Sequence, residues 1–264
     1  MTLSNDLLVL TAGDAEAVVD VESGGRLASL TIAGTNVLWS GADGAGDPDP
    51  LLWGSYPMVP FAGRIRHGKF TFDGTDYQLP PTLGDHAMHG YGYVSPWSRV
   101  DDSTIVWEFA KPWPFAGQAS QRFTLEPNSL TIEMHLHAFE RQPMQMGWHP
   151  WFVRNNDAGS LILSFPAQSM YLRDDDGMPG EIIATQPGPW DDCFLGLTGS
   201  PTLRWGDLSL TLTSSAGHWV VYDEPTHALC VEPQTCPPNA INTEPMILEA
   251  DQQTAATFTL AWPT

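Results

Sequence analysis

The sequence predicts an all-β protein, a large antiparallel β-sandwich, from three observations. Short runs of apolar or alternating residues recur along the chain, whereas the helical spacing of apolar residues is almost absent. The 24 glycines and 23 prolines are spread over the whole length and leave few places for a long helix. Short strands that recur in this way, joined by turns, favour a large antiparallel sandwich or barrel.

A series of segments has the pattern of strands. In chain order they are Ala17–Val21, Leu27–Ile32, Phe70–Phe72, Thr104–Phe109, Ser129–Leu136, Leu161–Phe165, Leu208–Thr213, Trp219–Tyr222, Leu229–Glu232 and Thr257–Trp262. Pairs of turn residues such as Gly24-Gly25 and Asp73-Gly74 separate them. Residues 38–60 and 173–192 show little strand pattern, so we expect long loops there, of the kind that often line a functional site.

We expect residues 1–264 to form one domain. The chain has no repeat, no low-complexity tract and no linker-like shift in composition, and its 28.9 kDa lies within the range of one large sandwich. A core of that size requires no metal or disulfide. The cysteines Cys193, Cys230 and Cys236 are odd in number and lack C-x-x-C spacing, which argues against a disulfide framework.

The charge balance narrows the class of partner. Acidic residues outnumber basic ones by 31 to 11, which gives a net charge of −20 with neutral histidines. Because a field of this sign repels phosphates and anionic headgroups, we expect neither nucleic acid nor membranes as partners. The N-terminus has no basic region before its short apolar run, so we expect no signal peptide. The prediction is a cytoplasmic protein, monomer or homodimer, that acts on a neutral small molecule.

Polar side chains stand among aromatic, glycine and proline residues in four segments, 60–70, 86–97, 147–152 and 229–242. His149 lies between two tryptophans and before Pro150, which disfavours helical backbone angles and predicts the end of a strand. Glu232 precedes Pro233 after an apolar run, so we also expect it at a strand end. Taken alone, His149 could be a hydrogen-bonded core histidine and Glu232 a solvated carboxylate.

Two pairs of histidines have spacings that occur in metal sites. His86 and His89 form H-x-x-H, and His135 and His137 form H-x-H on one face of a strand. Neither pair has a cysteine nearby or an obvious third ligand in the sequence. We therefore predict no metal. Arg64, taken alone, is compatible with a surface ion pair.

The order and neighbours of these segments resemble the aldose 1-epimerase (mutarotase) family, in its shorter bacterial branch. The motifs are G-R-I-R-H-G-K-F at 63–70, H-G at 89–90 with P-W at 96–97, G-W-H-P-W-F at 147–152, and E-P-Q-T followed by P-x-N-A-I-N at 232–242. The resemblance extends from about residue 10 to residue 262. It implies the galactose-mutarotase-like β-supersandwich and the interconversion of the α and β anomers of a free aldose, of the galactose or glucose type.

The resemblance also implies roles for the polar residues. His149 would be the general acid and Glu232 the general base. Opening the hemiacetal ring requires a base at the C1 hydroxyl and an acid at the ring oxygen, and ordinary pKa values allow an ionised Glu232 and, with a modest upward shift, a protonated His149. No redox or phosphate step occurs, so no cofactor is expected. Trp53, Trp148 and Trp151 could pack against the sugar.

Further residues follow from the same resemblance. His89 would donate a hydrogen bond near the ring oxygen of the sugar, and Arg64 matches the arginine of the family's N-R-I motif. Gly63 stands where that motif has asparagine, so any contact from its side chain is lost. The family's substrate-binding aspartate lies in a D-x-x-F element, which Asp191 fits; a slip of one residue would select Asp192 instead.

Three other functions remain open. A hexose-6-phosphate 1-epimerase would use the basic cluster at residues 64–69, although the net charge of −20 opposes a phosphorylated sugar. A sugar-binding module without activity would be expected to lack the acid or the base, and both are present. A glycoside hydrolase needs two carboxylates, which Asp191 and Glu232 could supply.

Overall fold

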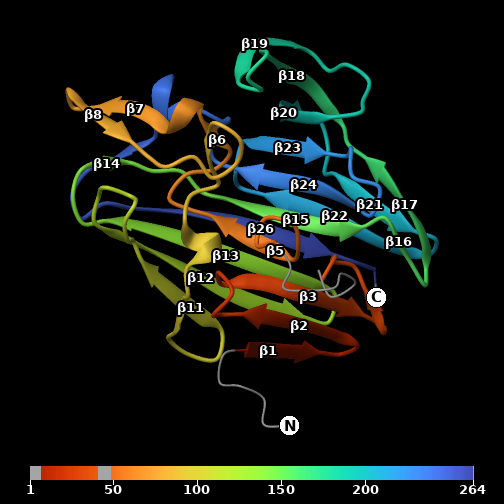
Figure 1. Ribbon diagram of the computed structural model, residues 1–264. Helices are drawn as coiled ribbons and strands as arrows, with labels where there is room; N and C mark the ends of the chain where they lie inside the picture. Colours follow the sequence, from red (N-terminus) through yellow and green to blue (C-terminus); the bar gives the residue numbers. More distant parts are fainter. Residues whose placement is uncertain (1–6, 41–48, 264) are drawn as a thin grey trace.

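The computed structural model describes residues 7–40 and 49–263 and confirms the predicted all-β fold. Most strands belong to two large antiparallel sheets, of 11 and 9 strands. The two sheets lie over one another, with the smaller strand pairs at their margin (Figure 1). Among the described residues the helices are short 3₁₀ turns, η1 (Arg66–Gly68), η2 (Gly92–Val94) and η3 (Ala240–Asn242), and none of them is long or apolar enough to cross a bilayer.

The 11-stranded sheet carries the candidate site. Its strands lie in the order β1 (Leu7–Ala12), β2 (Ala15–Asp20), β3 (Arg26–Ile32), β5 (Ser55–Met58), β15 (Gly147–Val153), β24 (Ala228–Gln234), β23 (His218–Tyr222), β20 (Asp191–Leu197), β18 (Ala167–Arg173) and β19 (Pro179–Ala184), with β4 (Thr35–Asn36) beside β3. Strands that are distant in sequence, such as β5, β15 and β24, are therefore direct neighbours at its centre.

The second sheet supplies the other half of the sandwich. Its order is β10 (Ser98–Arg99), β11 (Thr104–Glu108), β12 (Gly117–Glu126), β13 (Ser129–Ala138), β26 (Gln253–Ala261), β22 (Leu208–Ser214), β21 (Thr202–Trp205), β17 (Gly159–Ser164) and β16 (Asn155–Asn156). Three short pairs complete the fold, β6 (Arg64–Ile65) with β9 (Ala87–Met88), β7 (Lys69–Phe72) with β8 (Thr75–Gln78), and β14 (Gln142–Pro143) with β25 (Ile247–Leu248).

The core between the sheets follows from the alternation of side chains along each strand. In β13 every second residue is buried, including Leu130 and Ile132. In β15, Trp148 points into this core, and its ring lies 5.8 Å from that of Phe258 on β26. Because neighbouring residues on a strand point to opposite faces, His149 is directed away from the second sheet.

Arg26, at the start of β3, is a fully buried cation whose hydrogen-bond partners are backbone carbonyls. Its guanidinium donates at 2.6–3.0 Å to the carbonyl oxygens of Ser23, Pro50, Trp53 and Tyr93. The guanidinium carbon also lies 4.2 Å from the centroid of the Trp53 ring. These contacts join β3 to η2 and to the segment before β5. They therefore help to hold β5, the strand that carries Tyr56, in place beside β3.

Two expectations about loops and strand ends were wrong. Strands β5 and β19 lie within the segments expected to be long loops, of which residues 41–48 are outside the described residues. His149 and Glu232 lie inside seven-residue strands rather than at their ends. A proline removes one donor but readily adopts an extended backbone angle. The strands therefore continue through Pro150 and Pro233, while paired positions between β15 and β24 are interrupted from residue 148 to residue 150.

Candidate active site

One row of side chains crosses six neighbouring strands on the face of the 11-stranded sheet that is turned away from the second sheet. The register pairs Tyr56 with His149, and Val220 with both Glu232 and Cys193. In strand order the row is Tyr56 on β5, His149 on β15, Glu232 on β24, Val220 on β23, Cys193 on β20 and Tyr171 on β18. Residues far apart in the chain are thus brought side by side by strand pairing alone.

A second row lies two residues further along the same strands. Trp151 pairs with Cys230, Cys230 with Tyr222, and Tyr222 with Asp191. Because residues two apart on a strand share a face, this row points to the same side as the first. The two rows together form the floor of a site.

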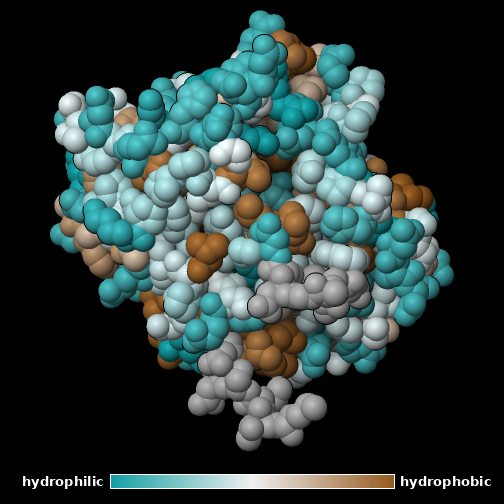
Figure 2. Space-filling view, in the orientation of Figure 1, coloured by the Kyte–Doolittle hydropathy of each residue, from teal (hydrophilic) through white to brown (hydrophobic). Residues whose placement is uncertain are grey.

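A cavity of about 390 Å³ lies over these rows and is the candidate active site. Residues of both rows line it, together with Arg64 on β6 and with Met88 and His89 from β9 and the turn after it. Its volume suits a small-molecule ligand. The surrounding face is predominantly hydrophilic, with scattered apolar patches (Figure 2).

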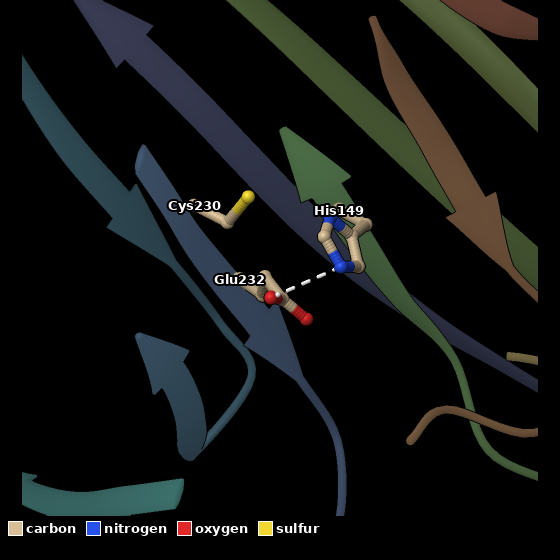
Figure 3. Close-up of side chains that lie close together, drawn as sticks. All are labelled: His149, Cys230 and Glu232. Carbon is tan, nitrogen blue, oxygen red and sulfur yellow. Dashed lines mark ion pairs between the residues drawn. The ribbon is translucent and has the colours of Figure 1, made fainter. Parts of the chain in front are cut away.

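His149 and Glu232 form a buried pair at the centre of the floor. His149 Nε2 lies 3.2 Å from Glu232 Oε1, and their side chains are 7% and 2% exposed (Figure 3). Burial lowers the pKa of His149 to about 3. Burial, with a smaller contribution from Asp191, raises the pKa of Glu232 well above its usual value, and Arg64 opposes that shift.

The protonation expected from the sequence therefore needs a correction. The sequence predicted an ionised Glu232 and a His149 whose pKa is shifted upward, but burial moves both pKa values in the opposite directions. Burial penalises charge on either group, so the favoured state has a protonated Glu232 whose hydroxyl donates to a neutral His149. In this state the pair holds one proton and carries no net charge.

Three aromatic rings fix the plane of the His149 imidazole. The ring stacks on Tyr56, with centroids 4.7 Å apart, and on Trp151, with centroids 5.3 Å apart. His89 meets it edge-on at 5.0 Å. Of the tryptophans expected near a sugar, Trp151 lines the cavity, whereas Trp148 lies in the core and Trp53 packs on Arg26.

His89 lines the cavity from the turn after β9. It is 8% exposed and has a φ of 59°, a left-handed conformation that turns its side chain toward His149. Burial, and after it His149 and Arg64, lowers the pKa of His89 well below its usual value. His89 is therefore neutral at physiological pH and can donate or accept a hydrogen bond.

Asp191 is the cavity-lining member of the Asp191–Asp192 pair. Its Oδ2 accepts hydrogen bonds from Arg64 Nη2 at 3.0 Å and from Arg173 Nη1 at 2.9 Å. Arg173 Nε also lies 2.8 Å from Asp192 Oδ1. Asp192 is buried beneath the site, and that burial raises its pKa. The structure thus brings Arg64, His89, His149, Asp191 and Glu232 to one cavity.

Sequence reasoning missed Tyr56 and Arg173. Each was placed in a segment expected to be a long loop, and neither carries a local motif. The basic cluster at residues 64–69, in contrast, reaches the cavity only through Arg64. Arg66 forms ion pairs with Asp174 and Asp176.

The two histidine pairs considered as half-sites have other partners. His86 Nδ1 accepts a hydrogen bond from the backbone N–H of His67 at 3.0 Å, while His89 faces His149. His135 pairs with Glu133 at the surface, with Nε2 and Oε1 2.9 Å apart. The ring of His137 lies edge-on to Phe139.

Gly63 occupies a position with no room for a side chain. Its φ is +66°, and a Cβ would lie 2.7 Å from the Cβ of Pro238. An asparagine, as in the N-R-I motif, would not fit here. We expect Gly63→Ala to destabilise the fold by about 1–3 kcal/mol, from backbone strain and overpacking, in denaturant unfolding.

Gly34→Ala is the matched control for that substitution. Gly34 also has a positive φ, +81°, but nothing lies within 4 Å of the point that a Cβ would occupy there. It should therefore show the backbone strain without the clash. If Gly63→Ala lowers the free energy of unfolding no more than Gly34→Ala does, Pro238 can move aside at no cost in stability.

Comparison with known proteins agrees with this fold. The family model described as Aldose 1-epimerase matches residues 6–261, and the chain therefore belongs to the aldose 1-epimerase family. Protein YphB of Escherichia coli K12 is 33% identical over 143 residues, which is 52% of this chain and 48% of YphB. Protein YihR of the same organism is 23% identical over 92% of this chain and 88% of YihR.

Solved structures show the same architecture. A galactose mutarotase-like protein from Clostridium acetobutylicum superposes with a TM-score of 0.84 at 17% identity, over 97% of this chain and 94% of that one. The galactose 1-epimerase of Lactobacillus acidophilus superposes with a TM-score of 0.79 at 16% identity, over 100% and 96% of the two chains. These likenesses confirm the galactose-mutarotase-like fold expected from the sequence.

Proposed function

We propose that this protein interconverts the α and β anomers of a free, uncharged aldose of the galactose or glucose type. The observation that carries the proposal is the buried pair of His149 and Glu232, with 3.2 Å between Nε2 and Oε1, on the floor of a cavity of about 390 Å³. Family membership supports epimerase chemistry in general. The name of the similar Lactobacillus acidophilus enzyme makes galactose the first sugar to test.

The reaction needs two coupled proton transfers. Glu232 takes the proton of the C1 hydroxyl while His149 donates one to the ring oxygen, which opens the ring to the aldehyde. Rotation about the C1–C2 bond presents the other face of the carbonyl. The same residues then return their protons in reverse roles, and the ring closes as the other anomer.

The number of protons on the pair stays constant through these steps. With the cyclic sugar the proton is on His149, and with the open-chain aldehyde it is on Glu232. The state that burial favours, a protonated Glu232 beside a neutral His149, is therefore the state that matches the open-chain intermediate. Sugar binding has to move a single proton across 3.2 Å to reach the starting state.

The charges around the cavity favour an uncharged sugar over a phosphorylated one. The two arginines that line it, Arg64 and Arg173, are both paired with Asp191. Two further carboxylates, Asp49 and Glu224, also line the cavity. A sugar phosphate would have to displace these ion pairs and approach an acidic wall.

The arrangement also disfavours glycoside hydrolysis. The candidate second carboxylate, Asp191, accepts hydrogen bonds from two guanidinium groups. Both contacts fall on Oδ2, so this oxygen of Asp191 is occupied by Arg64 and Arg173 and would have to leave them to reach a glycosidic oxygen.

Polarimetry tests the proposal directly. Freshly dissolved α-D-galactose and α-D-glucose are followed with and without catalytic amounts of protein, and glucose 6-phosphate under the same conditions. We expect faster relaxation of the free sugars to an unchanged final rotation. No acceleration of any free aldose would contradict the proposal and favour a sugar-binding module, and acceleration of the phosphate alone would overturn the uncharged substrate.

The pH dependence should differ from that of a solvated histidine. Because burial lowers the pKa of His149 to about 3, a second proton is excluded from the pair until the solution is strongly acidic. We expect kcat/KM to lack the inflection near pH 6.5 that an ordinary histidine would give. On the alkaline side activity falls once the raised pKa of Glu232 is passed. An inflection near 6.5 that disappears in His149→Asn would contradict this expectation.

A further inference from the structure

A third potential metal ligand lies beside the acid–base pair. The donor atoms of His149, Cys230 and Glu232 all lie within 4.8 Å of one another. Cys230 and Glu232 project from the same face of β24 toward His149 on β15 (Figure 3). The epimerase reaction proposed above uses His149 and Glu232 but assigns no role to the thiol of Cys230.

We propose that His149, Cys230 and Glu232 form a binding site for a thiophilic divalent cation, Zn²⁺ above all, and that the cation inhibits the enzyme by excluding the sugar. Zn²⁺ accepts nitrogen, sulfur and carboxylate ligands, and three protein ligands with one open position are a common set. Mg²⁺ and Ca²⁺ require oxygen ligands and would not use this site.

The geometry is close to what Zn²⁺ requires. Bonds of 2.0–2.3 Å in a tetrahedron place ligand atoms about 3.3–3.8 Å apart. The nitrogen and oxygen of His149 and Glu232 are already 3.2 Å apart. The sulfur, within 4.8 Å, has to approach by at most about 1–1.5 Å, a distance that side-chain rotation can provide.

The surroundings favour a bound cation. All three ligands are buried, and two of them, Cys230 and Glu232, can each supply a negative charge when the cation displaces their protons. The chain as a whole carries a net charge of −20, which raises the local concentration of cations. His149 and Glu232 line the cavity, which can supply a water as the fourth ligand.

An unpartnered hydroxyl gives independent support for a ligand at this point. Tyr56 is fully buried beside His149, and its Oη has no hydrogen-bond partner among the described residues. The ring of Tyr56 stacks on that of His149, with centroids 4.7 Å apart, and Tyr56 lines the same cavity as His149 and Glu232. A water on the cation would satisfy the hydroxyl.

Binding and inhibition follow from different properties of this site. Binding depends only on the three ligands. Inhibition rests on the proposed function, because the cation occupies the atoms of His149 and Glu232 that would otherwise exchange protons with the sugar. Zn²⁺ should therefore compete with the sugar.

Metal binding to the full-length, chelator-treated protein is the test. Zn²⁺ binding is measured by equilibrium dialysis for the wild type, Cys230→Ala and Cys193→Ala. Cys193 is the matched control, because it is a buried thiol that lines the cavity and lies outside the three-residue site. We expect one Zn²⁺ in the wild type and in Cys193→Ala, and at least about tenfold weaker binding in Cys230→Ala.

Cobalt supplies a spectroscopic readout of the thiolate. Co²⁺ in place of Zn²⁺ should give a thiolate-to-metal charge-transfer absorption in the wild type and in Cys193→Ala that Cys230→Ala and Cys230→Ser lack. Circular dichroism of Cys230→Ala and Cys230→Ser shows whether either variant is misfolded, so that a lost absorption is not mistaken for the effect of misfolding. Equal Zn²⁺ binding by all variants, or none by the wild type, would overturn the proposal.

Activity separates this proposal from the epimerase proposal. Each protein's rate with Zn²⁺ is expressed relative to its own metal-free rate. We expect inhibition that rising sugar concentration relieves in the wild type, and none by Mg²⁺. An active epimerase that binds no Zn²⁺ would refute only the metal site, whereas Zn²⁺ binding by a protein without epimerase activity would refute only the proposed function.

Discussion

Glu232→Gln is expected to lower kcat for anomer interconversion by about 10²–10⁴-fold while sugar binding is largely retained. The amide has the shape of the carboxyl group but cannot accept the C1 hydroxyl proton. Because Glu232 is buried and favoured in its protonated form, a neutral amide of equal size should not disturb the fold. Polarimetry gives the rate, and calorimetric titration with galactose gives the affinity.

Glu224→Gln is the matched control. Glu224 also lines the cavity, but it is exposed and is not part of the buried pair. Its substitution should leave the rate within a few-fold of the wild type. His149→Asn should resemble Glu232→Gln. Near-native rates in both Glu232→Gln and His149→Asn would show that the acid–base assignment is wrong, even though membership of the family stands.

Arg26→Met is expected to destabilise the fold by about 3–5 kcal/mol. The substitution keeps a long apolar stem but removes the donors that pair with four backbone carbonyl oxygens, those of Ser23, Pro50 and Trp53 in part-buried contacts and that of Tyr93 in a buried one. Burial lowers the pKa of Arg26 to about 10, so the guanidinium is charged at neutral pH and keeps all its donors. Denaturant unfolding measures the change.

Arg99→Met provides the comparison for Arg26→Met. Arg99 is exposed and pairs with Asp102 three residues away, so its loss should cost less than about 1 kcal/mol. For a chain of this size the Arg26→Met effect corresponds to a fall in Tm of about 10 °C. If the two variants have the same stability, the carbonyl oxygens around Arg26 must find other donors.

The sequence predicted strands where alternation is regular and missed them where it is not. Residues 129–136 alternate clearly and lie in β13, whereas β5 and β19 are short and lie in segments rich in glycine and proline. The order of strands in the sheets was not predictable, because pairing between β5, β15 and β24 depends on contacts between distant parts of the chain. The single domain, the cytoplasmic location and the oligomeric state stay predictions.

The candidate site was predictable to the extent that motifs mark it. Arg64, His89, His149, Asp191 and Glu232 all line the cavity, and each was found through a local pattern and its resemblance to a family. Tyr56 and Arg173 were not found, because they reach the site through strand register alone. The protonation of the buried pair was predicted wrongly, because it depends on burial, which no local pattern reports.

The rows of the cavity floor divide the work of the site among different strands. The proposed acid and base, His149 and Glu232, lie on the two central strands, β15 and β24, whereas Val220, Cys193 and Tyr171 come one each from β23, β20 and β18. Each outer position can change without moving its neighbours, because the backbone ladder holds every strand separately. In such a sheet, substitutions on the outer strands can accumulate independently of the residues on the central strands. A library of variants at Val220, Cys193 and Tyr171 alone is expected to alter which sugar is accepted, because His149 and Glu232 stay unchanged.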